Sequence, residues 1–368
     1  MKLSIKRETL LEPLQMVIGV VERRQTLPIL ANVLLTVQGT QLSVTATDME
    51  IELVANILLE NETKPTQLTV SGRKLLDIVR TLPENAIIDM QQDKERVIVR
   101  SGGSRFTLTT LPVTSFPKFE VAADAPALTL VLTQQDLATV LQRSHFAMAQ
   151  QDVRYYLNGM LLDVKNNRAC AVATDGHRFA LNSTAMNTED KSGQVILPRK
   201  GVLELMRLLK QDDSEISVTI GENYLRVHNT AFTFTSRLID GRFPDYERVL
   251  PTEQGNSITL NRDAFKNALL RASILSNEKL RTVRLQARSG FLHIGANNPE
   301  HEESEEILSI DYAGEELDIA FNVSYLLDVL NTTTSEDIQL RFIDTNTRLF
   351  MQEPNNQNSM FLIMPLQI

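Results

Sequence analysis

The sequence predicts an α+β protein that consists of three copies of one domain. Three observations predict this fold class. A strand followed by a helix recurs near each third of the chain, further landmarks recur in the same order, and alternating apolar and polar runs surround the predicted helices. A length of 368 residues agrees with several domains, because one hydrophobic core rarely spans so many.

Each copy opens with a short alternating strand. A polar cap with an acid in the first helical turn then begins an amphipathic helix. The three openings start at Leu3, Leu130 and Ile258. When the copies are aligned, Leu10 matches Leu137 at a step of 127 residues, and Leu137 matches Phe265 at a step of 128.

Three landmarks keep this register: one closes a strand, one begins the second helix and one ends the copy. They are Ala46-Thr-Asp, Ala173-Thr-Asp and Ala296-Asn-Asn, then Gly72, Pro198 and Asn322, and finally Phe116-Pro117 and Phe243-Pro244. Alternating runs at residues 41–47, 96–101 and 105–110 predict half-buried strands. We expect domains at residues 1–124, 125–254 and 255–368, with boundaries in the polar stretches 123–127 and 251–256.

The composition excludes several classes of protein. Lys and Arg number 37 against 46 Asp and Glu, a formal net charge of −9, which argues against a simple basic nucleic-acid binder. A hydrophobic content of 42% excludes wholesale disorder. The single cysteine, Cys170, excludes an intrachain disulfide framework. Because no segment has the pattern of a membrane helix or a signal core, we expect a cytoplasmic protein.

Positive charge gathers in windows that are predicted to be helices. Residues 196–211 carry four Lys and Arg against one acid, residues 262–281 carry five against two, and residues 71–80 carry three against one. A basic face of this kind attracts phosphates without reading bases. The alternative interpretation is a set of solvated amphipathic helices, and the helix after Asn322 lacks the bias.

The motif Ala173-Thr-Asp-Gly-His-Arg invites a catalytic interpretation in which Asp175 orients His177. The competing interpretation is a hairpin, because Asp-Gly between the strand-like runs 169–173 and 178–181 is a turn signal. No nucleophile, zinc-ligand spacing or glycine-rich phosphate loop accompanies the pair. We therefore predict a turn, and expect no catalytic residues, no cofactor and no metal site.

Several longer motifs are distinctive: Asp152-Val-Arg-Tyr-Tyr-Leu-Asn-Gly-Met-Leu, Ala173-Thr-Asp-Gly-His-Arg, Pro198-Arg-Lys-Gly-Val, Asp240-Gly-Arg-Phe-Pro-Asp-Tyr, Ala272-Ser-Ile-Leu-Ser-Asn-Glu-Lys and Met364-Pro365. Together they resemble the bacterial DNA polymerase III β subunit, the sliding clamp, over the whole chain. The resemblance implies three clamp domains per chain and a head-to-tail homodimer that closes around duplex DNA. Helices would line the hole and antiparallel sheets would lie outside. Twelve helices at ~9 Å spacing would leave a hole of roughly 35 Å, wide enough for a duplex.

The resemblance also implies a function without catalysis: the ring tethers the replicative DNA polymerase, and the clamp loader and repair proteins bind it through short linear peptides. The implied peptide cleft comprises Leu157, Thr174, Gly176, His177, Arg178, Phe179, Pro244, Arg248, Val249, Leu280, Asn322, Tyr325, Leu362, Met364, Pro365 and Leu366. Flexible and aliphatic side chains of this kind suit varied peptides. The alternative for each apolar member is an ordinary place in the core.

Two further sets of residues follow from the resemblance. The implied DNA contacts are Arg24, Arg73, Gln151, Arg154, Tyr155 and Tyr156, to which the basic window adds Arg199 and Lys200. The implied dimer interface joins Lys74, Arg105 and Phe106 of one protomer to Ile274, Leu275, Glu300, Glu302, Glu303, Glu305 and Glu306 of the other. Opposite charges at the two ends of one chain suit head-to-tail closure.

The chain departs from the pattern of the family at several positions. Leu280 stands where an aromatic residue is common and Phe179 where Leu is common, while Leu366-Gln367 replaces a Met-Arg ending. Asn346 and Arg348 occupy places near the cleft that are usually small or apolar, and Gly103 replaces a basic residue at the interface. We expect a working cleft with an altered peptide preference and one interface ion pair fewer.

Two other functions are the alternatives to a clamp. One is a hydrolase that uses Asp175 and His177, which predicts a turnover that His177→Ala abolishes. The other is a repeat scaffold that binds proteins but not DNA. Retention on circular and linear duplexes separates this scaffold from a ring, because only a ring slides off an open end.

Overall fold

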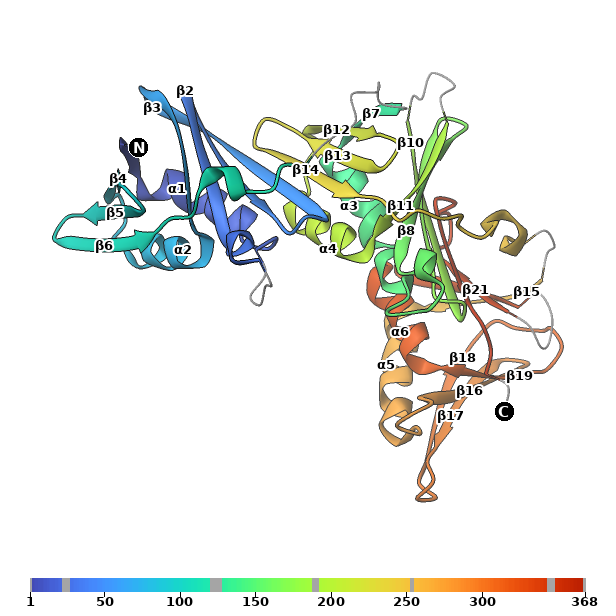
Figure 1. The fold of residues 1–368 in the computed structure, drawn as a ribbon. Helices are drawn as coiled ribbons and strands as arrows, with labels where there is room; N and C mark the ends of the chain where they lie inside the picture. Colours follow the sequence, from blue (N-terminus) through green and yellow to red (C-terminus); the bar gives the residue numbers. More distant parts are fainter. Residues whose placement is uncertain are drawn as a thin grey trace. The chain divides into compact units, whose positions relative to one another are not determined.

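The computed structural model describes residues 2–21, 27–119, 128–186, 192–251, 255–342 and 348–366. Within these ranges each predicted copy has two helices and antiparallel strands (Figure 1), so the predicted α+β class is confirmed. The first copy contains β1 (Lys2–Lys6), α1 (Arg7–Val17), β2 (Asn32–Thr47), β3 (Ile51–Ser71), α2 (Gly72–Thr81), β4 (Ile87–Asp93), β5 (Arg96–Ser101) and β6 (Ser104–Thr109).

The second and third copies repeat this order, except that four shorter strands take the place of the two long strands between the helices. The second contains β7 (Leu128–Thr133), α3 (Gln134–Gln142), β8 (Gly159–Lys165), β9 (Arg168–Thr174), β10 (Arg178–Ala185), β11 (Gly193–Pro198), α4 (Arg199–Leu208), β12 (Glu215–Ile220), β13 (Tyr224–His228) and β14 (Phe232–Arg237). The third contains β15 (Asn256–Asn261), α5 (Arg262–Ala272), β16 (Thr282–Arg288), β17 (Phe291–Asn297), β18 (Glu303–Ser309), β19 (Leu317–Asn322), α6 (Val323–Thr332), β20 (Asp337–Phe342), β21 (Leu349–Gln352) and β22 (Ser359–Ile363).

The chain divides into two compact units that do not follow the copies. One unit is Met1–Gln135 with Leu203–Leu238, and the other is Asp136–Val202 with Ile239–Ile368. The first unit holds the sheets β1-β4-β5-β6 and β2-β3-β14-β13-β12-β7. The second holds the sheets β11-β8-β9-β10-β22-β21-β20-β15 and β18-β17-β16-β19. Of the expected boundary stretches, residues 120–127 and 252–254 lie outside the described residues.

Neighbouring copies are joined by strand pairing of one kind. In the first unit β14 pairs antiparallel with β3, and Phe234 lies opposite Leu53. In the second unit β22 pairs antiparallel with β10, and Phe361 lies opposite Ala180. Both junctions turn two half-sheets into one continuous sheet, which removes two open strand edges. We call this arrangement the junction.

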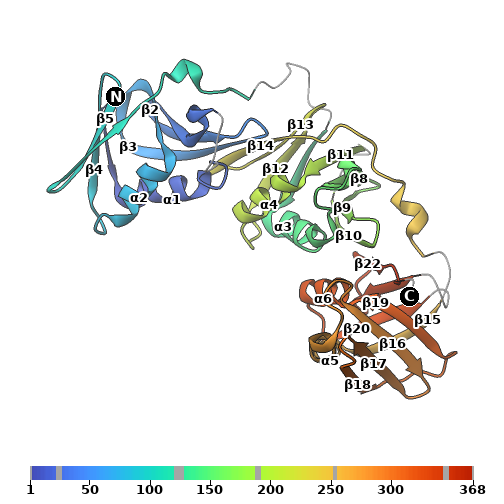
Figure 2. The same cartoon turned by 60° about the horizontal axis from the view of Figure 1, so that its bottom comes forward.

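The paired helices of each unit bury their apolar faces against the sheets. In the first unit α1 packs beside α2 (Figure 1), with Leu14 and Leu75 fully buried. In the second unit α5 packs beside α6 (Figure 2), with Phe265 and Leu326 fully buried. The first helical turns of α1, α3 and α5 carry the predicted acids. Among the described residues no helix is both long and apolar enough to span a membrane.

The junction of the second unit has a polar centre. Arg143 donates to Glu353 across 2.5 Å, and the same carboxylate accepts from the backbone N–H groups of Thr334 (2.7 Å) and Ser335 (3.0 Å) and from the Asn356 amide (2.6 Å). Glu353 is only 3% exposed. Burial alone raises the pKa of a carboxyl, but these donors outweigh it and hold the pKa of Glu353 below its ordinary value.

We expect Glu353→Gln to lower the free energy of unfolding at pH 7 by about 3 kcal/mol, because the buried Arg143 guanidinium loses its charged partner. A carboxyl whose pKa is lowered by folding stabilises the protein at a pH above its unfolded-state pKa of about 4.3. This stability is lost as the pH falls through the pKa of the carboxyl in the native state. The difference from the wild type, measured by urea unfolding, therefore shrinks below about pH 4. As a control, Glu60→Gln removes the exposed pair with Lys6 and changes stability by less than about 1 kcal/mol. A difference that does not vary with pH would contradict this role for Glu353.

Candidate functional site

The Asp-Gly motif forms the turn between β9 and β10. The Asp175 carboxylate accepts from the backbone N–H groups of His177 (2.9 Å) and Arg178 (3.0 Å) and from Arg178 Nε (3.0 Å). Gly176 has φ +90°, a conformation that favours glycine. The carboxylate therefore stabilises the turn, and the hairpin interpretation is confirmed over the catalytic pair.

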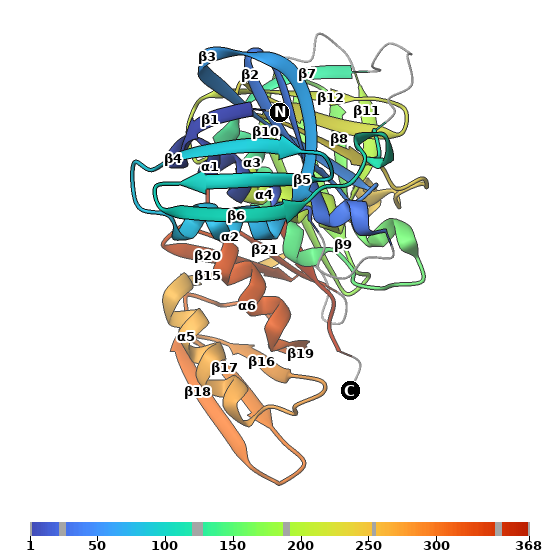
Figure 3. The ribbon, with the colours of Figure 1, turned by 60° about the vertical axis from the view of Figure 1, so that its left-hand side comes forward.

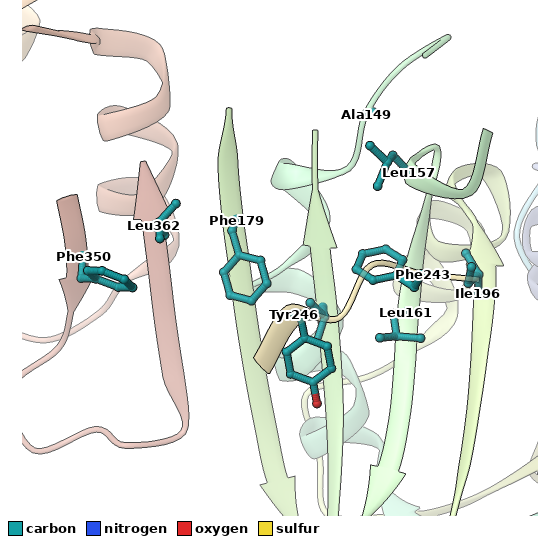
Figure 4. Close-up of a cluster of buried hydrophobic side chains, with 10 residues drawn as sticks. Ala149, Leu157, Leu161, Phe179, Ile196, Phe243, Tyr246, Phe350 and Leu362 are labelled. Carbon is teal, nitrogen blue, oxygen red and sulfur yellow. The ribbon is translucent and has the colours of Figure 1, made fainter. Parts of the chain in front are cut away.

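A cluster of buried apolar side chains lies beside this turn in the second unit (Figure 4). It includes Leu157, Phe179 and Leu362 from the expected cleft, and the expected Val249 packs against it half-buried. Phe179 on β10 lies opposite Leu362 on β22, so the junction itself brings these two side chains together. The cluster forms an apolar floor made by two copies of the domain.

Arg178 links the turn to α6. Its guanidinium donates to the Asp328 carboxylate and lies 4.6 Å from the centre of the Tyr325 ring and 5.6 Å from that of Phe146. Burial raises the pKa of the Tyr325 hydroxyl. A half-buried cation held by an acid and two aromatic faces is a rigid polar group beside the apolar floor.

The end of the chain is fixed next to the turn. The N–H of Met364 donates to the His177 carbonyl, and the N–H of Leu366 donates to the Ala320 carbonyl, both over 2.8 Å. Met364 remains 38% exposed, and Pro365 is half-buried. A flexible, partly exposed methionine at the rim of an apolar cluster is suited to contact a ligand.

The remaining expected cleft residues lie around this centre with varied exposure. Leu280 is 58% exposed, and Arg248, which pairs with Asp245, has 84% of its side chain exposed. Asn322 caps α6 by accepting from the Ser324 N–H, Thr174 accepts from the Gly176 N–H, and Pro244 is exposed. Asn346 and Gln367 lie outside the described residues.

Sequence analysis missed Phe146, Phe243, Tyr246 and Asp328. Phe243 belongs to the Phe-Pro landmark, which marked the register, and Tyr246 belongs with it to the motif Asp240-Gly-Arg-Phe-Pro-Asp-Tyr, which carried the resemblance. The recurrence of the landmark was a usable signal, because a landmark aromatic is commonly buried. Asp328 meets Arg178 across 150 residues of sequence, and no local pattern announces that pairing.

An open pocket of about 450 Å³ lies between the turn and the preceding loop of the second unit. Gln151 and Arg154, expected DNA contacts, line it together with His177 and Arg178, expected cleft residues. Arg154 donates to the Asp152 carboxylate over 3.0 and 2.8 Å. This pairing lowers the pKa of Asp152 to about 2.

The other expected DNA contacts are spread over the two units. In the second unit Tyr155 is 58% exposed and meets Tyr156 edge to face, Arg199 lies near the Met148 carbonyl at 3.5 Å, and Lys200 is half-buried. Burial lowers the pKa of Arg199. In the first unit Arg73 donates to the Val21 carbonyl over 2.7 Å. Arg24 lies outside the described residues.

The basic helices carry less free positive charge than their sequences indicate. Arg207 pairs with Glu204, Arg262 with Asp263, and Arg271 with Glu306. Glu204 and Asp263 were already visible in the same windows, but Glu306 comes from β18, 35 residues away. Counting charges within one window therefore leaves out a partner such as Glu306, which another element supplies.

The expected interface residues lie on two separate sheet edges. Arg105 and Phe106 are on β6, the last strand of its sheet (Figure 3), and Lys74 is exposed on α2. Glu303, Glu305 and Glu306 are on β18, also a last strand; Glu300 and Glu302 precede it, with Glu302 bonded to Asn298. Beside β18, Ile274 is 76% exposed, and Leu275 next to it is half-buried.

Comparison with known proteins gives a consistent result. Three family models match in order: the N-terminal domain of the DNA polymerase III β subunit over residues 1–120, the central domain over 131–245 and the C-terminal domain over 247–367. The β sliding clamp of Pseudomonas putida is 51% identical and that of Escherichia coli K12 is 46% identical, each with both chains covered completely.

Solved structures agree with these sequence matches. The DNA polymerase III subunit β of Pseudomonas aeruginosa superposes with a TM-score of 0.97 at 47% identity, and that of Caulobacter crescentus with 0.92 at 34%. Both comparisons cover all of this chain and all of the other. Three domains in one order, and close relatives that match from end to end, show that the chain belongs to the DNA polymerase III β subunit family, the bacterial sliding clamps.

Proposed function

We propose that this chain closes as a homodimeric ring around duplex DNA and holds its partners through short peptides bound beside the β9–β10 turn. Membership in the sliding-clamp family carries the general function, that of a non-catalytic processivity factor in DNA replication. The observation that supports the ring most strongly is the junction between strands of neighbouring copies. It occurs twice within the chain, and one further strand of each kind, β6 and β18, remains at the end of its sheet.

The two strands that remain are β6 and β18. In the half-sheets β1-β4-β5-β6, β7-β12-β13-β14 and β15-β20-β21-β22, the last strand is the one that can form a junction. β14 pairs with β3 and β22 pairs with β10, whereas β6 has no partner among the described residues on its outer side and ends its sheet. β18 ends the half-sheet β19-β16-β17-β18 as β10 ends β11-β8-β9-β10. Head-to-tail pairing of β6 with β18 of a second copy would complete both edges.

The internal junctions predict the register of this pairing. Phe106 lies opposite Val99, as Phe234 lies opposite Val227 in the next copy, so the two phenylalanines are equivalent. At the first junction Phe234 pairs with Leu53, and Leu53 in turn faces the landmark residue Ala46 on the neighbouring strand. At the second junction Phe361 pairs with Ala180, and Ala180 faces the landmark residue Ala173.

In β18 the residue that faces the landmark Ala296 is Ser304. Phe106 is then expected opposite Ser304 of the second copy, and Arg105 opposite Glu305. Arg105 and Glu305 are both exposed in the single chain. A directly opposed cation and anion favour one register and one partner. Glu306 contributes less, because Arg271 of its own chain already neutralises it.

Contact with DNA is expected to be weak and independent of sequence. Net charge is −9, and several helix arginines are paired within the chain, so binding from outside is disfavoured. A ring needs only loose phosphate contacts, which permit sliding. The exposed ring of Tyr155 offers a surface on which an unpaired base can stack.

The apolar floor, the fixed Arg178 guanidinium and the exposed Met364 support the peptide cleft. A solved Pseudomonas aeruginosa clamp is bound to griselimycin, which supplies a probe for this chain. Apolar pockets with few fixed polar groups bind ligands by burial and orient them by hydrogen bonds.

The ring is tested by topology. After loading with a clamp loader and ATP, we expect the chain to remain on a nicked circular plasmid in high salt, where phosphate contacts are screened, and to leave when one cut makes the plasmid linear. Gel filtration of the complexes measures retention, and the same plasmid before and after cutting is the matched pair. Equal retention on both forms, or none on the circle, would contradict encirclement.

Deleting residues 364–368 tests the cleft. Because the deletion removes Met364 and the two backbone hydrogen bonds of the chain end, we expect griselimycin affinity to fall at least about tenfold with the dimer intact. Isothermal titration measures affinity and sedimentation measures the dimer. Met49→Ala, which trims an exposed methionine in the corresponding turn of the first copy, is the control and leaves affinity unchanged. An unchanged dissociation constant after the deletion would refute this site.

A further inference from the structure

A partly buried ionic cluster adjoins the apolar floor, and the proposed function does not use it. The Tyr246 hydroxyl donates to Asp163 Oδ2 over 2.5 Å, and Lys165 Nζ lies 3.0 Å from the same oxygen. Lys165 also contacts the Glu247 carboxylate at 2.6 Å. The Asp163 side chain is 1% exposed.

Such a cluster is expensive to bury. Removing the Asp163 carboxylate from water costs several kcal/mol, and its attraction to the Lys165 ammonium, whose side chain is 30% exposed, does not reliably return it. Although burial lowers the pKa of Lys165, its bonds to Glu247 and Asp163 raise it above the ordinary value, so Lys165 stays charged. Burial, together with the bond to Asp163, raises the pKa of Tyr246, so its hydroxyl keeps its proton.

The first copy of the domain shows that the fold does not need this cluster. In the register of the Phe-Pro landmarks, Thr36 stands at the place of Asp163, Gln38 at that of Lys165, and Phe119 at that of Tyr246. The first copy thus builds the same strand and the same landmark without charges at these positions.

Tyr246 connects the cluster to the cleft. Its ring stacks on that of Phe179, with centroids 6.4 Å apart and planes at 26° (Figure 4). It also begins the short 3₁₀ helix Tyr246–Val249, which carries two expected cleft residues, Arg248 and Val249. The Lys165 ammonium lies 5.1 Å from the centre of the same ring. The hydroxyl of Tyr246 is therefore fixed by Asp163, while its ring contacts Phe179 and its backbone begins the Tyr246–Val249 helix.

We propose that Asp163, Lys165 and Tyr246 are positioning residues that hold Phe179 and the Tyr246–Val249 helix in the geometry that binds peptide. This inference rests on the proposed cleft. A cleft wall that is ordered before binding loses less conformational entropy when the ligand arrives, and this loss otherwise weakens affinity. None of the three residues needs to touch the peptide.

The test measures griselimycin affinity by isothermal titration on the full-length protein. We expect Tyr246→Phe and Asp163→Ala each to weaken binding about tenfold, and the double variant to weaken it by less than the product of the two losses, because each single variant already removes the Tyr246–Asp163 hydrogen bond. Transplanting the residues of the first copy, as Asp163→Thr, Lys165→Gln and Tyr246→Phe together, gives the same loss in a sequence that this fold already accommodates. Tyr312→Phe removes a buried hydroxyl that bonds to Glu315 elsewhere in the same unit, and it leaves affinity unchanged.

A second readout separates positioning from general stability. Hydrogen exchange of residues 244–250 is expected to speed up in the cluster variants, while retention on circular DNA stays at the wild-type level. Unchanged affinity in the transplanted variant, or a matching loss in Tyr312→Phe, overturns the inference. Failure of the wild-type chain to bind griselimycin overturns the proposed cleft first, whereas binding by the wild type with no effect of the variants overturns only this positioning role.

Discussion

The structure depends on one interaction, the antiparallel pairing of the last strand of one copy with an edge strand of the preceding copy. An open strand edge presents unpaired N–H and C=O groups, and a folded protein must cover it or risk uncontrolled association. The chain covers two such pairs of edges internally, through β14 with β3 and β22 with β10. The third pair is β6 and β18, which belong to different units of the chain. In the proposed ring, closure between two copies covers these two edges as well.

The same backbone frame serves different purposes at its two internal positions. Where β22 meets β10, Phe179 and Leu362 face each other and form the apolar floor. Where β14 meets β3, the corresponding pair is Glu52 and Thr235. Burial raises the pKa of Glu52, a group unsuited to an apolar ligand. Repetition of the frame therefore supplies the architecture, and a few side chains make only one of the two junctions suitable for the proposed peptide.

Much of the fold could be predicted from the sequence because it is local. Strand alternation, the helix starts expected at Gly72, Pro198 and Asn322, and the Asp175 turn all depend on neighbouring residues, and the structure has them within one residue of the expected places. The sheets that run from copy to copy could not be predicted in this way. Their pairings join residues more than a hundred positions apart, and alternation does not name a partner strand.

The site divides along the same line. The residues of the expected cleft were predicted from the resemblance of motifs, whereas the residues that hold them in place are visible only in the structure. Tyr246 reaches Asp163 over 83 residues and Arg178 reaches Asp328 over 150. The charge pattern is limited for a related reason. Arg271 pairs with Glu306 on another element, so counting charges along one helix overstates the positive electrostatic field of that helix.

The most direct test of the central claim is a disulfide across the proposed third junction. In a Cys170→Ser background, Phe106→Cys combined with Ser304→Cys should oxidise to a covalent dimer, because opposed strand residues meet the distance a disulfide requires. Phe106→Cys combined with Glu305→Cys should not, since a shift of one residue points the second thiol to the other face. Efficient cross-linking of the first pair alone is the predicted result. No covalent dimer from the first pair, or equal yield from both, would contradict the account.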